Sequence, residues 1–592
     1  MDNYIFAVDF ETYYDKECSI RTLGTLGYFS HPKFDAYLVS VVGTDGTEYV
    51  GHPKDFDWSL LNDNIVLSHN ASFDETLYLY GVDKGWWGSC EPNQWYCTAD
   101  MSAYCKLPRS LKGATSEAFG LTMDKTTRDN MSGKKWEDMK EDFKEEVIEY
   151  ALKDSLLCLR LWDEYQSHWP EFERKISRIN RDIVQGGIPI DCGLLKKQLE
   201  TINQELFKAE ENIPWLGEKP LLSRAAFNDQ CRIVGIEPPV SLAATDEEAK
   251  QWVDFHQREH KWVNAVRDWR RINSIKKKLE SFDYATMPDS RYYGGMMYFG
   301  AHTGRFSGSG GNLNLQNLPR EEMFGVNLRN LISPEPEKRL VVVDLSQIEV
   351  RTLCWLAGDS NMMDEIASSD DIYEAFAIRF GMWDKESGVL KNKDSKLRHR
   401  VKTMVLGCGY GAGFKRFASM AGMSEDEAET AVSLYRNKMK KIKSLWYSYN
   451  NDLESAYESN TQIDTNFSID LPSGRSLDYG QLKRTNEDGK NHYLADIPRH
   501  GKKVQVRLWG GLIAENASQA LARDIFSDML LRVNAEGYKI IMHVHDELVV
   551  EADSEDAQDA LDRIIEIMSE PPEWIKDIAL DAEGSILTRY EK

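Results

Sequence analysis

The sequence lacks the marks of membrane-bound, secreted and zinc-binding proteins. No apolar run is long enough to span a bilayer, and the N-terminal stretch MDNYIFAVDFETYY has neither a basic segment nor an apolar core with a small-residue cleavage site. The nine cysteines are scattered without a CxxC pair, so free, mostly buried thiols in a reducing compartment are the simplest interpretation. We therefore expect a cytoplasmic protein that does not associate with membranes.

An excess of basic residues is missing as well. The chain has 72 Lys and Arg against 96 Asp and Glu, a net charge of −24. Net charge governs solubility and long-range steering rather than the content of a cleft, so a nucleic-acid enzyme with locally gathered cations is not excluded. One basic stretch is KWVNAVRDWRRINSIKKK, residues 261–278. Its cations Arg270, Arg271, Lys276 and Lys277 either line a solvated helix face or bind nucleic-acid phosphates, and the stretch alone favours neither.

The chain of 592 residues is too long for one hydrophobic core, so several domains are expected. Apolar segments at residues 4–9, 35–42 and 64–68 are typical of strands, and residues 141–162 have the pattern of a helix. This alternation predicts a compact α/β domain over about the first 165 residues. Later segments are mainly helical, with strand-like runs at 340–344 and 538–544 and an amphipathic helix at 557–568, which indicates α+β structure.

Four acids in the first part of the chain form a pattern that suits metal-dependent phosphodiester hydrolysis. Asp9 and Glu11 lie two apart on a predicted strand and so share one face. Asp74 follows in HNASFDE, and Tyr150 and Asp154 are one helical turn apart. A pair of metal ions held by such acids lowers the pKa of the attacking water and stabilises the leaving oxygen; Tyr150 is placed to orient that water.

These residues resemble the DEDD-type 3′–5′ proofreading exonucleases of the tyrosine subclass. The resemblance extends to KLPRSLKG, residues 106–113. It implies that Asp9, Glu11, Asp74 and Asp154 hold metal ions and that the site receives a single-stranded DNA 3′ end.

A second pair of acids lies far apart in the C-terminal part. Asp344 ends an apolar run in VVVDLSQIEVR, and Asp546 sits in IIMHVHDELVVE, which predicts a tight hairpin with its acids at the turn. Acids beside apolar runs are costly to bury unless they are paired or bind metal. One such motif could be an ordinary surface hairpin, but two of them with a basic helix between are harder to explain in that way.

That basic helix is LRHRVKTMVLGCGYG. Arg398, Lys402, Leu406 and Tyr410 recur every four residues and are expected to form one stripe. The two cations would anchor a triphosphate, and the last two residues offer a floor on which a base can stack. The alternative is an amphipathic helix whose cations are solvated.

Together the three segments resemble motifs A, B and C of the family-A DNA polymerases, the DNA polymerase I family, in the short form common in bacteriophages. TGRFS (303–307) and NLQNLPR (314–320) match further. The resemblance implies a ribonuclease H-like exonuclease domain at 1–170, followed by a right-hand polymerase. Its expected parts are a thumb at 171–300, palm at 301–350 and 505–592, and fingers at 351–504. We expect no 5′-nuclease domain ahead of the exonuclease.

The resemblance also implies roles for individual residues. Asp344, Asp546 and the Leu345 carbonyl would bind two Mg²⁺ ions, with Mn²⁺ as a substitute, and Glu547 would support them near the primer end. Lys402 would also protonate the departing pyrophosphate, and Glu349, touching Tyr410, would disfavour a ribose 2′-hydroxyl. The remaining implied contacts are with the dNTP (Arg398, Lys402, Leu406, Tyr410, Tyr373 and Gln347) and with DNA (Arg305, Gln519, His545, Asn314 and Gln316). The stretch 261–278 would then be a thumb helix that grips duplex phosphates.

Three positions depart from the commonest family pattern. Leu406 stands where Phe or Tyr is usual, Tyr373 where His is frequent, and His543 where Gln is commoner. The first two put nucleotide selection in question, although the Tyr373 hydroxyl retains one hydrogen bond to donate. His543 is assigned no role.

The expected partners are primer–template DNA and replisome proteins such as a helicase–primase and a processivity factor, in the cytoplasm of a bacterial host if the chain is phage-encoded. Two other functions stay open. A single-subunit RNA polymerase shares a palm with paired acids, but Glu349 and the exonuclease pattern argue against it. An inactive nucleic-acid-binding scaffold would not need two complete sets of acids.

Overall fold

The computed structural model describes residues 3–121, 126–243, 246–309, 313–369, 371–460, 466–487, 489–499 and 502–591. Within these ranges no helix combines the length and the apolar character needed to cross a bilayer. All nine cysteines are free thiols.

The N-terminal part is built on a mixed five-stranded sheet in the order β3-β2-β1-β4-β5. The strands are β1 (Ile5–Thr12), β2 (Ala36–Gly43), β3 (Glu48–Gly51), β4 (Ile65–Ser68) and β5 (Gln94–Cys97). The central strand β1 pairs antiparallel with β2 and parallel with β4. Helices α1 (Ile20–Phe29), α2 (Ala71–Asp83), α3 (Thr98–Tyr104), α4 (Leu111–Phe119), α5 (Thr126–Met131) and α6 (Glu141–Tyr165) surround it. The predicted strands and the long helix are therefore present, and α6 packs on β1 and β2.

The C-terminal part contains a second sheet, in the order β16-β17-β10-β18. Its strands are β10 (Lys338–Leu345), β16 (Ile540–Val544), β17 (Glu547–Asp553) and β18 (Ala582–Leu587). Apolar side chains bury β10 on both faces, with α21 (Ala557–Ser569) packed against it. The long, almost wholly buried helix α20 (Gly510–Ala535) packs against α12 (Ile348–Leu356) and α21.

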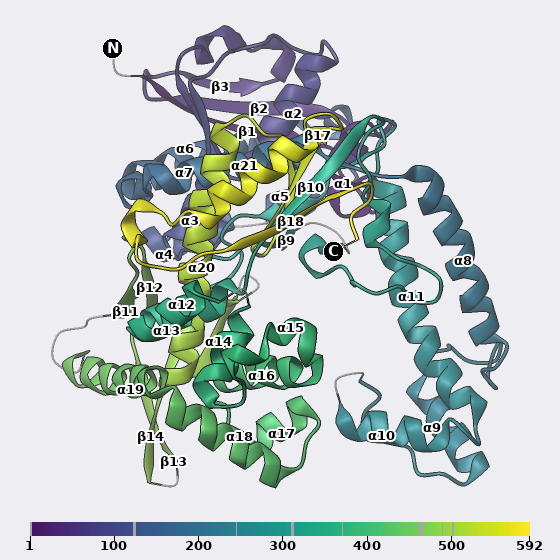
Figure 1. Ribbon diagram of the computed structural model, residues 1–592. Helices are drawn as coiled ribbons and strands as arrows, with labels where there is room; N and C mark the ends of the chain where they lie inside the picture. The colour runs from purple at the N-terminus through teal and green to yellow at the C-terminus, as the bar shows by residue number, and fades with distance from the viewer. Residues whose placement is uncertain are drawn as a thin grey trace.

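Helices project from this sheet in two groups, which Figure 1 shows on either side of an open space. One group is the arm of α8 (Cys192–Glu210), α9 (Arg224–Val234), α10 (Glu247–His256) and α11 (Lys261–Ala285), in which α8 and α11 lie together. The other contains α12, α13 (Ser360–Ala367), α14 (Ile372–Phe380), α15 (Leu390–Lys393), α16 (Ser395–Cys408), α17 (Phe414–Ala421), α18 (Glu425–Lys438) and α19 (Lys440–Asn460). The two groups and the sheet between them correspond to thumb, fingers and palm.

Short strands complete the chain. They are β6 (Ile188–Pro189), β7 (Arg291–Tyr292), β8 (Gly295–Met297), β9 (Ser307–Ser309), β11 (Phe467–Asp470), β12 (Ser476–Gly480), β13 (Lys483–Glu487), β14 (Lys490–Arg499) and β15 (Lys502–Leu508). The last three form a sheet of their own between α19 and α20.

Two expectations need correction. Helix α16 ends at Cys408, so Tyr410 lies beyond the helix that was predicted to carry it. Gly411 follows with a φ of 79°, a left-handed conformation that stops a helix. In addition, α7 (Glu171–Gly186), predicted to begin the thumb, packs against α20 and β16 of the palm. The projecting arm begins only with α8.

Candidate active sites

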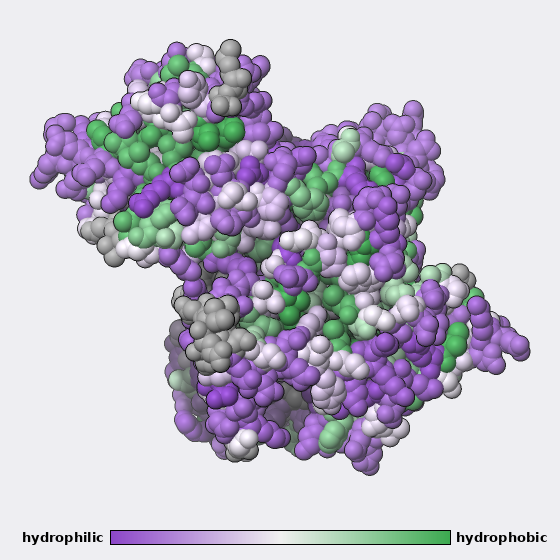
Figure 2. Space-filling view, turned by 90° about the vertical axis from the view of Figure 1, so that its left-hand side faces the viewer, coloured by the Kyte–Doolittle hydropathy of each residue, from purple (hydrophilic) through white to green (hydrophobic). Residues whose placement is uncertain are grey.

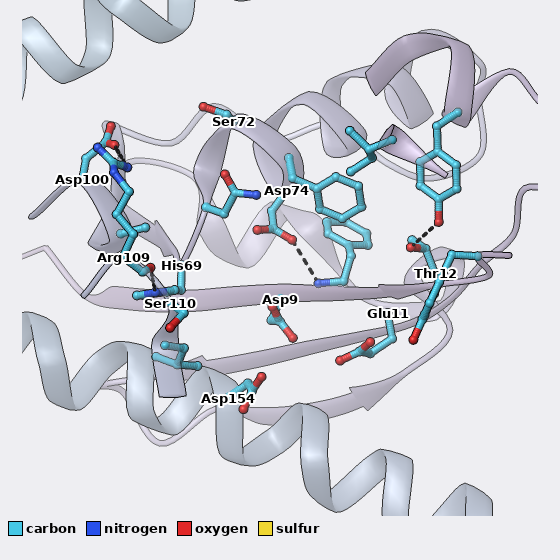
Figure 3. Close-up of a pocket in the computed structure, with 18 of the residues that line it drawn as sticks. Asp9, Glu11, Thr12, His69, Ser72, Asp74, Asp100, Arg109, Ser110 and Asp154 are labelled. Atoms are coloured by element: carbon cyan, nitrogen blue, oxygen red, sulfur yellow. Dashed lines mark hydrogen bonds and ion pairs between the residues drawn. The ribbon is translucent and has the colours of Figure 1, made fainter. Parts of the chain in front are cut away.

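The four N-terminal acids line one cavity of about 720 Å³, together with Tyr150. Asp9 and Glu11 both lie on β1, and they share one face because alternate residues of a strand point to the same side. Asp74 comes from the first turn of α2. In Figure 3, Asp154 on α6 points toward Asp9 and Glu11, while Asp74 lies on the other side of Asp9. The structure thus brings Asp9 and Asp154, which are 145 positions apart in the sequence, into one cavity.

Burial and mutual repulsion raise the pKa of these carboxyl groups in the absence of a cation. Burial, with the nearby Glu11, raises the pKa of Asp9 well above its usual range. Burial, with Asp154 nearby, raises the pKa of Glu11 to about 8. It also raises the pKa of Asp74 to about 7 and that of Asp154 to about 6. Such a site favours divalent cations, which remove the repulsion.

The donor atoms fit a metal site in chemical type. One oxygen of Asp74 accepts the backbone N–H of Phe10 at 3.2 Å, which orients the group. The Oδ1 atom of Asp154 is buried and accepts no hydrogen bond, so it lacks the donor that a buried carboxylate oxygen usually has. Among the described residues, no three His, Cys, Asp or Glu side chains lie close enough to enclose one ion as they stand. Holding an ion therefore requires the carboxylates to draw together.

Several polar residues of this cavity were not anticipated. Arg128 on α5 lines it, and its guanidinium lowers the pKa of both Asp9 and Glu11 against the effect of burial. Arg109 donates to Asp100 at 2.8 Å and also to the Tyr298 carbonyl. The latter bond joins this cavity to the polymerase part. The matched string KLPRSLKG contains Arg109, but nothing in the sequence pointed to Arg128.

The second pair of acids meets on the palm sheet. Asp344 on β10 lies opposite Glu547 of β17, and Asp546 precedes Glu547 in the two-residue turn between β16 and β17. The backbone N–H of Leu345 donates to the Asp546 carbonyl at 3.1 Å, which fastens the turn to β10. Asp344, Asp546 and Glu547 line a cavity of about 320 Å³. Glu583 of β18, which was not among the predicted residues, lies opposite Asp344 on its other side.

The electrostatics of this cavity resemble those of the first. Burial, with the negative charge of Asp344, raises the pKa of Asp546 to about 7. Glu547 accepts a hydrogen bond from the Tyr590 hydroxyl at 2.6 Å. The adjacent carboxyl groups therefore repel one another at neutral pH, and a cation between them would relieve that repulsion.

Gln316 supports the hairpin rather than facing solvent. Its side-chain amide donates to the His543 carbonyl and accepts the N–H of His545, both at 2.8 Å, and the side chain is buried. His545 is exposed at the turn with a φ of 56°. The DNA contacts predicted for Gln316 and His545 stay predictions, but the structure shows that the Gln316 amide is engaged by the backbone beside Asp546.

The stripe that was predicted to bind a triphosphate is partly ordered by contacts within the protein. Arg398 donates to both oxygens of Asp371, at 2.6 and 3.1 Å. Lys402 lies 5.9 Å from the centre of the Tyr373 ring. The Tyr373 hydroxyl donates to the side-chain oxygen of Gln347 at 2.5 Å. The hydrogen bond expected from Tyr373 to a nucleotide is thus made within the protein.

The other residues predicted around the nucleotide lie near the end of α16. Leu406 is 45% exposed, which is unusual for a leucine and leaves it free to touch a ligand. Glu349 forms an ion pair with Arg305. Burial, with the charge of Glu349 nearby, raises the pKa of Tyr410, which places the two side chains close together. Gln519 is half-buried on α20, and Asn314 is exposed and caps a short helical turn.

The basic stretch 261–278 forms the first part of α11. Arg271 and Lys277 are exposed, while Arg270 and Lys276 are half-buried. Arg271 stacks 5.4 Å from the centre of the Phe324 ring, and Lys276 lies 3.8 Å from Glu280. The cations are available at the surface of the arm, and their role toward DNA stays a prediction.

A four-stranded palm with acids at neighbouring strand ends, flanked by a fingers group and a thumb arm, defines the class of right-hand polymerases. The match to a family model is specific: residues 195–592 fit DNA polymerase family A. The chain therefore belongs to DNA polymerase family A.

Relatives and a solved structure agree with this assignment. The chain is 26% identical to the DNA polymerase of Bacillus phage SP02, with 99% of each chain covered. It is 23% identical to the thermostable DNA polymerase I of Thermus aquaticus, covering 70% of this chain and 48% of the relative, so it spans about half of that protein. The fold is similar to that of the POL domain of Pol1 from M. smegmatis, solved with DNA primer–template and dNTP. The TM-score is 0.70 at 18% identity, with 100% of this chain and 96% of that one covered.

Proposed function

We propose that the chain extends a DNA primer by template-directed transfer of nucleotides from dNTPs, and that it removes mispaired nucleotides at a separate 3′–5′ exonuclease site. The observation that carries the first activity is the meeting of Asp344, Asp546 and Glu547 on adjacent palm strands, although Asp344 and Asp546 are 202 positions apart. The phage relative and the solved complex with primer–template and dNTP support it.

At the polymerase site, Asp344, Asp546 and the Leu345 carbonyl would hold divalent metal ions, Mg²⁺ or in its place Mn²⁺. When bound, these ions activate the primer 3′-hydroxyl and stabilise the charge on the phosphoryl group. Arg398 and Lys402 bind the triphosphate, and Lys402 supplies a proton to the departing pyrophosphate. Glu349, fixed by Arg305 beside Tyr410, fills the space that a ribose 2′-hydroxyl would need.

At the exonuclease site, Asp9, Glu11, Asp74 and Asp154 would hold Mg²⁺, which supplies an activated water and stabilises the leaving oxygen. Tyr150 orients the water, and the cavity receives a single-stranded 3′ end. The orphaned oxygen of Asp154 and the raised pKa values of the four carboxyl groups support this assignment. Genome replication in a bacteriophage is the biological setting that the phage relative suggests.

The polymerase assignment is tested with Asp546→Ala. Removing this carboxylate is expected to abolish primer extension, with a loss of at least about 1,000-fold, roughly 4 kcal/mol of transition-state stabilisation. Degradation of a single-stranded 3′ end should persist at the wild-type rate. Extension near the wild-type rate would show that Asp546 is not a metal ligand. Comparing dNTPs with rNTPs on the same primed template separates a DNA from an RNA polymerase.

The exonuclease assignment is tested with the double substitution Asp9→Ala and Glu11→Ala. Degradation of a mismatched primer end is expected to disappear while extension of a matched end is kept. The single variant Asp546→Ala and this double variant serve as controls for each other, because each leaves the other site intact. If the Asp9/Glu11 variant also loses extension, a folding defect or a shared site replaces the proposed division of labour.

A further inference from the structure

The sheet β13-β14-β15 is a basic surface in an acidic chain. Residues 483–507 contain seven Lys and Arg against three Asp and Glu, whereas the whole chain has 72 against 96. The three strands are antiparallel, and the sheet lies beside α19. No residue of this sheet belongs to either acid-lined cavity. A cationic surface of this kind in a net-negative protein indicates a local anionic partner.

A groove of about 710 Å³ runs between this sheet and α19. Figure 2 looks onto the side of the molecule on which α19 and β14 lie, and its lower half is mostly hydrophilic. The lining combines amides, cations and aromatic rings with a single acid: Asn450, Asn451, Glu454, Lys490, Asn491, His492, Tyr493, Arg507, Leu508 and Trp509.

The cations of the groove are accessible. Arg507 is about half exposed; its guanidinium touches the His492 imidazole at 2.5 Å and lies 3.8 Å from Glu487. Lys490 is exposed and forms no ion pair with a described residue. Two cations and an imidazole therefore face solvent at one end of the groove, where anionic phosphates can reach them.

The other end of the groove reaches the polymerase site through Trp509. This side chain is 38% exposed. A side chain at Gly411 would begin 2.9 Å from the Trp509 ring, and one at Gly511 would begin 2.3 Å from the Tyr410 carbonyl and 2.1 Å from the same ring. Trp509 thus lies directly against the chain segment that follows α16. Trp509 is therefore an exposed aromatic side chain that lies between the groove and the segment that carries Tyr410.

We propose that this groove binds the single-stranded template ahead of the templating base. The inference rests on the proposed polymerase function and adds a path for the strand that enters the site. Trp509 provides a face on which an unpaired base stacks, and Lys490 and Arg507 contact the phosphates beyond it. Cations combined with exposed aromatic faces are the usual means of binding single strands without reading their sequence.

The test measures the affinity for primer–template DNA as a function of template overhang, without nucleotide. One substrate carries an overhang of one nucleotide and the other an overhang of about ten, within the range that single-strand-binding grooves cover. The wild-type protein should bind the longer overhang more tightly. The double variant Lys490→Gln and Arg507→Gln should lose about 5- to 10-fold on the long overhang and keep its affinity for the short one. For the long overhang, the slope of the logarithm of the association constant against the logarithm of the salt concentration should be shallower by about 1.4 in this variant. Each cation that contacts single-stranded DNA contributes about 0.7 to that slope.

The matched control is Lys438→Gln with Lys440→Gln, an equal change of charge at exposed positions of the same group of helices, outside the groove. A second variant, Trp509→Leu, tests base stacking. The wild type should bind more weakly when the unpaired template positions nearest the primer are abasic, and Trp509→Leu should not show this loss of affinity. Melting curves report whether Trp509→Leu folds. The charge variants leave the packing of Trp509 unchanged.

Three outcomes overturn the proposal: unchanged affinity of the double variant for the long overhang, an equal loss for both overhangs, or a loss that appears only when a displaced non-template strand is present. Failure of the polymerase function is detected separately, because extension of the short-overhang substrate by wild-type protein does not depend on the groove.

Discussion

At the scale of single residues, Arg398, which we propose binds the triphosphate, is already held in place by contacts within the protein. The guanidinium donates twice to Asp371 and lies 5.1 Å from the centre of the Tyr373 ring. The hydrogen bonds that Arg398 donates to Asp371 raise the pKa of its guanidinium, so it stays charged. Asp371 also caps α14 by accepting the N–H of Tyr373 at 3.3 Å. The planar fork of arginine is therefore held in one orientation by the protein itself.

Replacing Arg398 by lysine is expected to raise the KM for dNTPs about 10-fold, equivalent to about 1.4 kcal/mol, with a smaller effect on kcat. Lysine keeps the charge but cannot make the two-bond contact with Asp371, so its position is no longer fixed. Steady-state single-nucleotide incorporation measures both constants.

The matched control is Arg400→Lys, the same substitution at an exposed position two residues along α16. It should leave the KM unchanged. An unchanged KM in the Arg398 variant would show that charge alone, rather than orientation, binds the triphosphate.

At the scale of elements, the β16–β17 hairpin carries backbone strain beside Asp546, the acid that we propose binds metal. Its turn consists of His545 and Asp546, and His545 has a φ of 56°, the left-handed region that favours glycine. Gln347, three residues after Asp344, also has a positive φ of 52°. Left-handed residues that are not glycine persist where the surroundings fix them, and at His545 the buried amide of Gln316 provides that constraint.

His545→Gly is expected to raise the free energy of unfolding by about 1 kcal/mol while lowering polymerase activity. Glycine adopts the left-handed conformation without the steric cost that an L side chain bears. The same change removes the imidazole predicted to contact the nascent base pair. Urea unfolding and primer extension measure the two effects.

His545→Ala separates backbone from side chain, since it removes the imidazole but keeps the strained φ. It should lower activity as glycine does without the gain in stability. A gain in stability for alanine equal to that for glycine would contradict the strain argument.

The predictability of these elements from sequence follows the range of the interactions involved. The alternation that places Asp9 and Glu11 on one strand face is a local pattern, and it is present in β1. The roles of Gln316 and Asp371 depend on partners that the sequence alone does not identify. Gln316 meets the hairpin across 227 to 229 positions. Tyr410 lies outside α16, although it continues the four-residue spacing, because Gly407, Gly409 and Gly411 lower the helix propensity of this segment.

At the scale of the whole molecule, a buried network of charges joins three parts of the chain. Glu173 on α7 accepts two hydrogen bonds from Arg523 on α20, at 2.5 and 2.8 Å, and a third from the Tyr298 hydroxyl at 2.7 Å. The neighbouring Asp524 pairs at 3.0 Å with Arg475, which precedes β12. Since Arg109 of the N-terminal part donates to the Tyr298 carbonyl, the network connects the two regions that contain the acid-lined cavities.

Glu173→Gln is expected to lower the free energy of unfolding at pH 7 by about 3 kcal/mol, because the buried Arg523 loses the carboxylate that accepts two of its hydrogen bonds and is left with Asp524 at 3.3 Å. Burial by itself would raise the pKa of Glu173, but attraction and hydrogen bonds from Arg523 outweigh it, and the pKa lies below the ordinary value of 4.5. The stabilisation is therefore fully present above pH 4.5 and is lost as the pH falls through the lowered pKa. The deficit of the variant should shrink accordingly between pH 7 and pH 3.5, as measured by urea unfolding.

The control is Glu171→Gln, which neutralises an exposed acid two residues earlier on the same helix. It should change stability by no more than about 0.5 kcal/mol at either pH. If the Glu173 variant were equally destabilised at both pH values, the loss would reflect packing rather than charge. A pH-dependent deficit would instead show that the ion pair between α7 and α20 helps to hold α7 against the palm.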